Sequence, residues 1–187
     1  MTHVTLQSVG SSYRNNSSWK KGLTLLFVIT FFYLFIMISF FWVTNISTTL
    51  TIGQSMTPTI LDNSTLMYST SPMLKERLNR FDIIIFKKEK EDGAIEQNAK
   101  RVVGLPGDHV VIDYGKLFIN GELIEENYIN DVVWGDAAND QTNIVVPEGH
   151  LFVLGDNRNF SNDSRGDEIG MVSLDDEYLG MYLISFK

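Results

Sequence analysis

A serine and a lysine lie in two segments of this chain whose residue types could support nucleophilic chemistry. The serine is Ser55, in residues 53–59 (GQSMTPT), and the lysine is Lys100, in residues 99–108 (AKRVVGLPGD). A serine hydroxyl is a poor nucleophile until a neighbouring base takes its proton. Together with an apolar segment that precedes them, these two residues suggest a serine/lysine hydrolase that works at a membrane surface.

The usual base for such a serine is histidine, and the chain has three: His3, His109 and His150. His3 lies in a polar N-terminal segment, and the other two lie beside predicted strands without an evident catalytic partner, so we interpret them as surface or turn residues. Lysine then becomes the candidate base. It can serve only when neutral, and lowering its pKa by about 3 pH units through burial costs roughly 4 kcal/mol. Lys100, between an alanine and a β-branched run, has suitable neighbours, although a lysine at the start of a strand is ordinary by itself.

Composition narrows the chemistry. The chain has no cysteine, which excludes thiol catalysis, disulfides and thiolate metal sites. No cluster of metal ligands stands out in the sequence, so we expect no metal and no organic cofactor. Beyond the apolar segment, 12 Lys and Arg stand against 23 Asp and Glu, a formal charge of −11. This excess argues against nucleic acid as a partner, and solubility is its simplest explanation.

The apolar segment is residues 22–43, which contain no Asp, Glu, Lys or Arg. As a helix it would span about 33 Å, the hydrocarbon thickness of a bilayer. It is longer than the core of a cleaved signal peptide and has no small-x-small exit site, so we predict an uncleaved transmembrane helix. Arg14, Lys20 and Lys21 precede it, which places the N-terminus in the cytoplasm by the positive-inside tendency.

We therefore expect three parts: a cytoplasmic tail (1–21), a transmembrane helix (22–43) and one extracytoplasmic domain (44–187). Short β-branched runs alternate with turn residues in the third part, which predicts a mainly β domain. The runs are residues 80–86, 101–104, 108–112, 116–124 and 145–154.

Turns and loops of this domain can also be read from the sequence. Asn120 and Gly121 predict a tight hairpin turn, because both residues readily adopt positive φ. The mixed charges of residues 87–93 suit a solvated loop or hairpin tip. Residues 155–170 form a long polar loop, the kind of segment that often carries site residues.

Four segments resemble, in order, the motif boxes of type I signal peptidases, which are membrane-anchored serine endopeptidases. They are residues 53–59, 80–86, 100–108 and 155–166. Each box is weak alone, but four in the right order after an apolar anchor are highly specific. The resemblance implies a signal-peptidase-like β fold, attachment to the lipid bilayer and removal of signal peptides from exported preproteins.

By the same resemblance, Ser55 is the nucleophile and Lys100 the general base, first for the serine and then for the deacylating water. Ser161 corresponds to the residue that hydrogen-bonds and orients the lysine amine. Asp163 and Arg165 match a pair that braces the active-site loop.

The resemblance also implies substrate pockets that accept small residues at the first and third positions before the cleaved bond, and it maps them to Met56, Ile60 and Ala99. Asn98 and Ala99 stand where many relatives carry a larger aromatic and aliphatic pair, so the resemblance does not fix the pocket shape or the substrate range. The Ser55 backbone N–H is the expected oxyanion donor. Some family members have a serine two residues before the nucleophile, and its hydroxyl is a second oxyanion donor. This chain has Gly53 there, which resembles the Gram-positive-type branch, so the second donor is not identified.

Two other functions share some of these features. A signal-peptidase-like assembly factor, for example in pilus biogenesis, would bind exported subunits without proteolysis, and the presence of both Ser55 and Lys100 weighs against it. A self-cleaving serine/lysine repressor would use the same pair, but the apolar anchor and the lack of a recognisable DNA-binding segment disfavour it.

Overall fold

The computed structural model describes residues 17–90, 92–129, 133–135 and 141–187, and it divides into a helical unit and a β unit between Thr44 and Asn45. Most of the predicted cytoplasmic tail, residues 1–16, lies outside the described residues. The predicted boundary between anchor and external domain differs from this division by a single residue. Each unit is considered separately below.

The first unit contains one helix, α1 (Ser17–Thr44). It begins five residues before the predicted start at Gly22, because Lys20 and Lys21 are good helix formers and extend the helix beyond the uncharged segment. Within it, Trp19–Phe41 is long and apolar enough to cross a membrane, with a mean hydropathy of 2.5. At about 1.5 Å per residue these 23 residues span about 35 Å.

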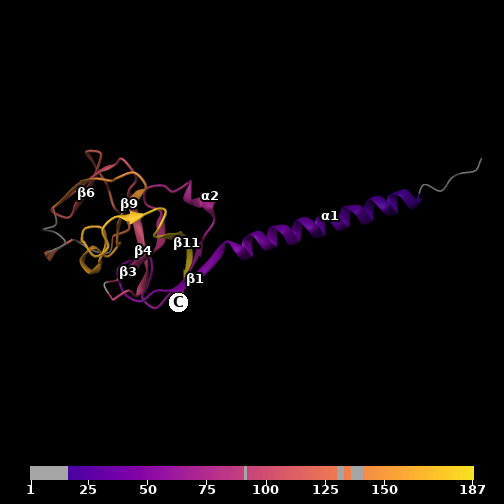
Figure 1. Cartoon of the computed structure of the whole chain (residues 1–187), viewed down its shortest axis with the longest axis horizontal. Helices are drawn as coiled ribbons and strands as arrows, with labels where there is room; N and C mark the ends of the chain where they lie inside the picture. Colours follow the sequence, from indigo (N-terminus) through magenta and orange to yellow (C-terminus); the bar gives the residue numbers. More distant parts are fainter. Residues whose placement is uncertain (1–16, 91, 130–132, 136–140) are drawn as a thin grey trace, which may run out of the picture. The chain divides into compact units, whose positions relative to one another are not determined.

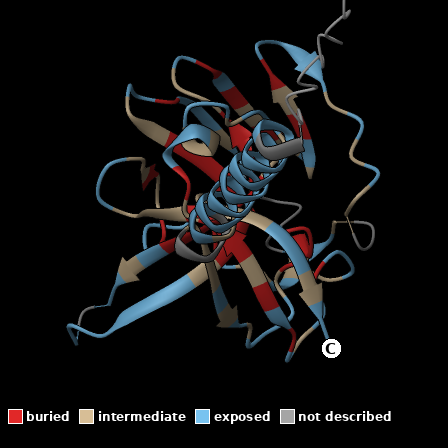
Figure 2. Ribbon diagram, turned by 90° about the vertical axis from the view of Figure 1, so that its right-hand side faces the viewer, coloured by how far each residue is buried: buried red, intermediate tan, exposed pale blue. Residues whose placement is uncertain are grey.

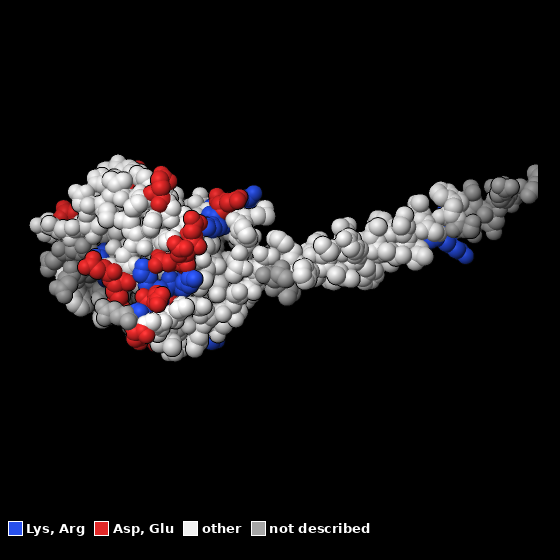
Figure 3. Space-filling model, viewed as in Figure 1, with Lys and Arg blue, Asp and Glu red and all other residues white. Residues whose placement is uncertain are grey.

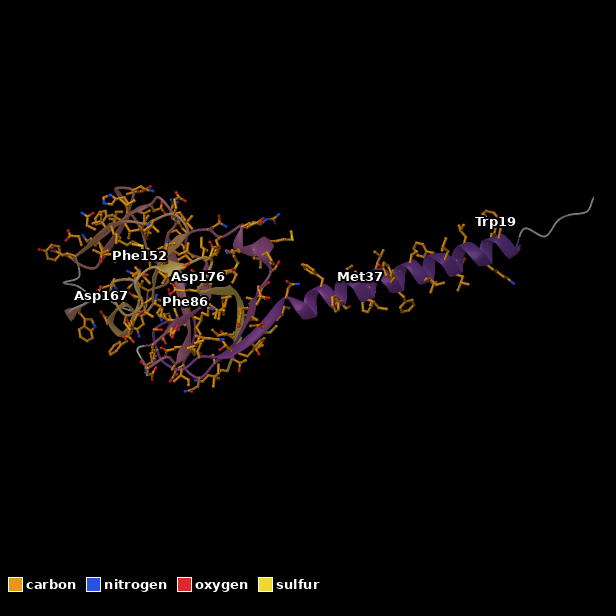
Figure 4. All side chains as sticks on the ribbon, viewed as in Figure 1. Trp19, Met37, Phe86, Phe152, Asp167 and Asp176 are labelled. Carbon is orange, nitrogen blue, oxygen red and sulfur yellow. The ribbon has the colours of Figure 1, made fainter. Side chains whose placement is uncertain are left out.

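The side chains of this span have no protein core to cover them. Figure 2 shows α1 almost wholly in the colour of exposed residues, and in Figure 4 Trp19 and Met37 point away from the helix axis. In Figure 3 its surface carries basic side chains only near the N-terminal end. Since so much apolar surface is unfavourable in water, such a helix requires an apolar environment, as a transmembrane helix has.

The second unit is built from two antiparallel sheets, which confirms the prediction of a mainly β domain (Figure 1). The larger sheet has seven strands, in the order β1 (Ile46–Leu50), β2 (Thr65–Ser69), β11 (Tyr178–Phe186), β3 (Ile83–Glu89), β4 (Ile95–Gly104), β9 (His150–Leu154) and β10 (Val172–Ser173). The smaller sheet has the order β7 (Glu122–Leu123), β6 (Lys116–Ile119), β5 (His109–Asp113) and β8 (Thr142–Val145). Two short helical turns, α2 (Pro72–Lys75) and η1 (Arg158–Phe160), lie in the connections.

Turn chemistry explains two of the hairpins. Asn120 and Gly121 have φ values of 53° and 85° and join β6 to β7, as predicted. At the other hairpin, the mixed-charge run ends β3 and turns into β4, where the Gly93 backbone N–H donates to the Lys90 carbonyl at 2.9 Å. Both turns use residues that tolerate positive φ, so local sequence is enough to predict them.

Four strands of the larger sheet, β1, β2, β10 and β11, are absent from the sequence-based expectations. β1 consists of Ser and Thr between two aliphatic residues, and its residues are half-buried or exposed. In β11 the pairing register shifts twice, between Tyr178 and Gly180 and between Tyr182 and Ile184. Such bulges interrupt the period-two alternation by which a strand is recognised.

The core of the larger sheet lies on both faces of β3. Ile83 and Ile85 pack with Met56, Ile60 and Ala99 on one face. On the other face, Ile84 and Phe86 pack with β4, β9 and β10, whereas Phe152 belongs to the cluster between the two sheets. Phe86 and Phe152 lie inside the β unit in Figure 4. A strand buried on both faces is held firmly, so β3 and its neighbour β4 give the site a rigid base.

Candidate active site

Ser55 lies in the connection between β1 and β2, in a compact turn. The Thr57 backbone N–H donates to the Gln54 carbonyl at 3.1 Å, and the Ile60 N–H donates to the Met56 carbonyl at 2.9 Å. Met56 and Ile60 are 3% and 2% exposed and insert into the core. The turn is therefore anchored by the two apolar residues that flank the serine segment, while Ser55 itself stays half-buried.

Lys100 lies in the buried half of β4, where it pairs with Ile84 of β3. Its side chain is folded against its own strand, because Nζ lies 3.2 Å from the Ala99 carbonyl oxygen. The same Nζ lies 2.8 Å from Ser55 Oγ. The structure thus brings the two sequence-predicted residues within hydrogen-bond distance.

The surroundings of Lys100 favour its neutral form. The residue is only 3% exposed, and this burial lowers its pKa to about 8, against the opposing charges of Asp163, Glu96 and Asp156. With that pKa, about one amine in ten is neutral at pH 7. Nζ can therefore accept the proton of a hydroxyl 2.8 Å away.

Two hollows lie on the surface of the β unit among the described residues, and only one of them contains a possible nucleophile and base. A small cleft of ≈ 50 Å³ is lined by Ser55, Lys100 and all three predicted pocket residues, Met56, Ile60 and Ala99. A larger one of ≈ 770 Å³ is lined mainly by charged side chains from residues 88–96 and 167–169, without a pair of nucleophile and base. In the described part of the chain, no group of three or more His or carboxylate side chains could hold a metal ion.

Asp163 and Arg165 form a two-pronged ion pair. Arg165 Nε donates to Asp163 Oδ1 at 2.7 Å, and its Nη2 donates to Oδ2 at 2.9 Å. The Asp163 side chain is fully buried and also accepts the Gly155 backbone N–H at 3.0 Å. The pair thereby closes the loop from residue 155 to 165 on itself.

A family model described as signal peptidase, peptidase S26, matches residues 23–181. The chain belongs to this family. The signal peptidase I P of Bacillus subtilis subsp. natto is 37% identical over 131 residues, which cover 66% of this chain and 68% of that protein. The signal peptidase IB of Staphylococcus aureus is 32% identical over 150 residues, or 72% of this chain and 73% of that protein.

A solved structure of a signal peptidase I from Enterococcus faecalis V583 is 32% identical, covers 56% of this chain and 95% of its own, and aligns with a TM-score of 0.44. The family match and the relatives confirm the resemblance to type I signal peptidases. They also confirm that the protein is an enzyme of the serine peptidase class.

In this signal peptidase Ser161 lies close to the site, but among the described residues it makes no hydrogen bond to Lys100. Its Oγ is buried and has no hydrogen-bond partner among the described residues. It packs instead against Gly155, where an added Cβ would lie 2.1 Å from Ser161 Oγ and 2.5 Å from the Ser55 carbonyl oxygen. Gly155 is therefore a point of close approach between the loop and the serine turn, and the Asn157 N–H donates to that same carbonyl at 3.0 Å.

A second buried ion pair of the signal peptidase site is absent from the sequence-based predictions. Arg101 Nε and Nη2 donate to the two oxygens of Asp156, at 2.8 and 2.5 Å, and the Thr59 hydroxyl also donates to Asp156. The pair links β4, the serine turn and the loop. Two adjacent charged residues, Lys100 and Arg101, between Ala99 and Val102 in the buried half of β4 were the available signal, since a buried charge needs a partner.

Proposed function

We propose that this S26 signal peptidase cleaves the signal peptides of exported preproteins with Ser55 as the nucleophile and Lys100 as the general base. The observation that carries the assignment is the 2.8 Å distance between Ser55 Oγ and the Nζ of a buried lysine. The lowered pKa of Lys100, about 8, supports it, because the base must be neutral to act.

The reaction has two halves. Neutral Lys100 takes the Ser55 proton while Oγ attacks the scissile carbonyl carbon, and the resulting ammonium then gives this proton to the leaving amine. A water molecule, deprotonated by Lys100, next attacks the carbonyl carbon of the acyl-enzyme ester. The C–Oγ bond breaks, the lysine ammonium returns the proton to Ser55 Oγ, and the signal peptide leaves with a new carboxylate. The Ser55 backbone N–H serves as one oxyanion donor, and Asp163 with Arg165 braces the loop beside the site.

The cleft supports a preference for small side chains before the cleaved bond. Met56, Ile60 and Ala99 line a space of ≈ 50 Å³ beside Ser55, enough for a few water-sized groups. A small side chain fits there, and a bulky one is excluded.

Chain length and charge support a substrate held at the membrane. Ser55 follows Val43 by 12 residues, so even an extended connection keeps it within about 40 Å of the membrane face. Lys20 and Lys21 at the N-terminal end of α1 support a single-pass orientation with a cytoplasmic N-terminus and an extracytoplasmic β unit. A cut site near the bilayer suits preproteins that are still anchored by their signal peptides.

Cleavage of a preprotein with an Ala-x-Ala site by the full-length protein in detergent tests the proposal. We expect Ser55→Ala and Lys100→Ala each to abolish cleavage without unfolding the β unit. Ser47→Ala on β1 and Lys116→Ala on β6 serve as matched controls that retain cleavage. Activity in either dyad variant would remove that residue from the mechanism, and no cleavage by the folded wild type on several preproteins would favour the non-proteolytic assembly factor.

A further inference from the structure

A short segment after β7 connects two buried arginines that lie near the dyad. The Tyr128 ring covers the Arg101 guanidinium, with Cζ 4.1 Å from the ring centroid. The Tyr128 hydroxyl donates to Glu126 Oε1 at 2.6 Å, and this same oxygen accepts a hydrogen bond from Arg158. Glu126 and Arg158 are both nearly inaccessible, with side chains 5% and 3% exposed.

The first arginine belongs to the strand of the base. Arg101 directly follows Lys100 in β4, is paired with Asp156, and donates Nη1 to the Phe81 carbonyl at 2.8 Å. The Tyr128 ring covers a face of the guanidinium that these in-plane hydrogen bonds leave open. An aromatic ring over a desolvated guanidinium attracts the cation and shields the ion pair from water.

The second arginine belongs to the loop. Arg158 donates Nε to the Gly155 carbonyl at 3.1 Å, and its own carbonyl accepts from Arg165 at 2.9 Å. Gly155 is the residue packed against Ser161 and the Ser55 carbonyl. Glu126 therefore holds, through Arg158, a point of close approach between the loop and the serine turn.

We propose that Glu126 and Tyr128 are positioning residues of this peptidase: by holding Arg158 and Arg101 together, they keep the loop and β4 in the arrangement that places Lys100 beside Ser55. They act through the two arginines rather than on the reacting atoms. This inference rests on the proposed roles of Ser55 and Lys100.

Charges around the base explain why positioning matters for its titration. The carboxylates that face Lys100 are Asp156, Asp163 and Glu96, and each opposes the effect of burial on its pKa. Arg101 neutralises Asp156, and Arg165 neutralises Asp163. If Arg101 loses its cover, water reaches the ion pair, and both the weaker burial and the freer Asp156 charge raise the pKa of Lys100.

The titration of Tyr128 does not overlap with that of Lys100 in a pH profile of cleavage. Burial, and next the charge of Glu126, raise its pKa well above the ordinary value for tyrosine. The phenol therefore stays protonated over the alkaline range in which Lys100 titrates, and an alkaline limb in the pH profile reports the lysine.

The test is the pH profile of kcat/KM for preprotein cleavage by the full-length Tyr128→Leu protein. We expect the rising limb of this profile, where Lys100 loses its proton, to move to higher pH by about one unit. At pH 7, kcat/KM should fall roughly tenfold, and the loss should shrink at alkaline pH. Tyr128→Phe keeps the ring, so its limb stays at the wild-type pH, although the rate falls with the lost Glu126 hydrogen bond. Tyr114→Leu, at an exposed tyrosine 72% accessible, is the matched control and leaves the profile unchanged.

A Tyr128→Leu limb at the wild-type pH, whatever the loss of rate, would overturn the inference and leave a merely structural role. If that variant does not fold, Tyr128→Met takes its place with the same expected shift. Ser55→Ala and Lys100→Ala, assayed in parallel, separate the two proposals. Cleavage by either would overturn the proposed function and this inference with it, whereas an unshifted limb beside two inactive dyad variants overturns only the inference.

Discussion

At the scale of single residues, the proposed chemistry of this signal peptidase depends on one amine kept away from water. Lys100 is 3% exposed, and none of the ion pairs among the described residues engages it. Its carboxylate neighbours Asp156 and Asp163 each form an ion pair with an arginine. Burial therefore prevails over attraction, and the pKa of Lys100 falls to about 8.

The rate of cleavage should follow the deprotonation of this amine. We expect kcat/KM to rise with pH below about 8 and to level off above it, because only neutral Lys100 can take the Ser55 proton. Initial rates on an Ala-x-Ala preprotein from pH 6 to 10 measure this limb. A profile that is flat across the alkaline range would exclude a lysine base with this pKa.

Removing the amine should stabilise the protein while it inactivates the enzyme. The pKa of Lys100 is lower folded than unfolded, so the unfolded chain binds more protons between about pH 8 and 10.5, and stability rises with pH through that window. Below the window the buried amine costs folding energy. We expect Lys100→Met to raise the free energy of unfolding by about 1 to 3 kcal/mol at pH 7, less at pH 10.

Chemical denaturation at the two pH values, with the exposed-site variant Lys116→Met as control, measures this difference. If Lys100→Met were no more stable than the wild type at pH 7, burial of the amine would not lower the free energy of unfolding.

At the scale of elements, the site is a junction of three segments that the sheet order brings together. The serine turn joins β1 to β2, Lys100 lies in β4, and the polar loop follows β9, which pairs with β4. Backbone contacts fix the junction: the Asn157 N–H donates to the Ser55 carbonyl, and Gly155 packs against the same oxygen. The loop therefore sets where the serine stands relative to the lysine.

A methyl group added at this junction should move Ser55 away from Lys100. In Gly155→Ala the new Cβ would lie 2.1 Å from Ser161 Oγ and 2.5 Å from the Ser55 carbonyl oxygen, so the loop or the turn must move. Because a displacement of about 1 Å can cost on the order of a hundredfold in rate, we expect a loss of about that size in kcat/KM. Gly166→Ala is the control in the same loop, since a Cβ added there would lie no closer than 3.5 Å to its nearest neighbour, Asn162 Oδ1. Equal activity of the two variants would contradict the proposed role of the contact.

At the scale of the whole molecule, an apolar helix and an acidic β unit belong to different solvents. The 23 residues Trp19–Phe41 carry exposed apolar side chains along their length, and the chain beyond the anchor carries a formal charge of −11. The helix suits a bilayer, and the β unit suits water on one side of it.

The natural absence of cysteine allows the proposed orientation to be measured without background labelling. We expect a membrane-impermeant maleimide to label Lys116→Cys, on an exposed strand residue, in intact cells. Ser8→Cys, N-terminal to the anchor, should react only after the membrane is permeabilised, because the basic residues before the anchor retain the N-terminus in the cytoplasm. The reverse labelling pattern would refute the orientation.

The amino-acid sequence by itself determined the features that depend on local chemistry. The uncharged run predicts the helix, Asn120 and Gly121 predict the hairpin turn, and the lack of a suitably placed histidine points to lysine as the base. These depend on residues close together in the chain, whose backbone preferences and polarity act without the rest of the fold. The motif order also identified the family, which the comparisons confirm.

Only the tertiary structure decided which distant side chains meet. Ser55 and Lys100 are 45 residues apart, and the pairing of Arg101 with Asp156 and the covering of Arg101 by Tyr128 join segments from different sheets and loops. The bulged strand β11, inserted between β2 and β3, leaves no clear period in the sequence. Strand order and register bring these groups together, and both are set by packing of the whole core rather than by any single segment.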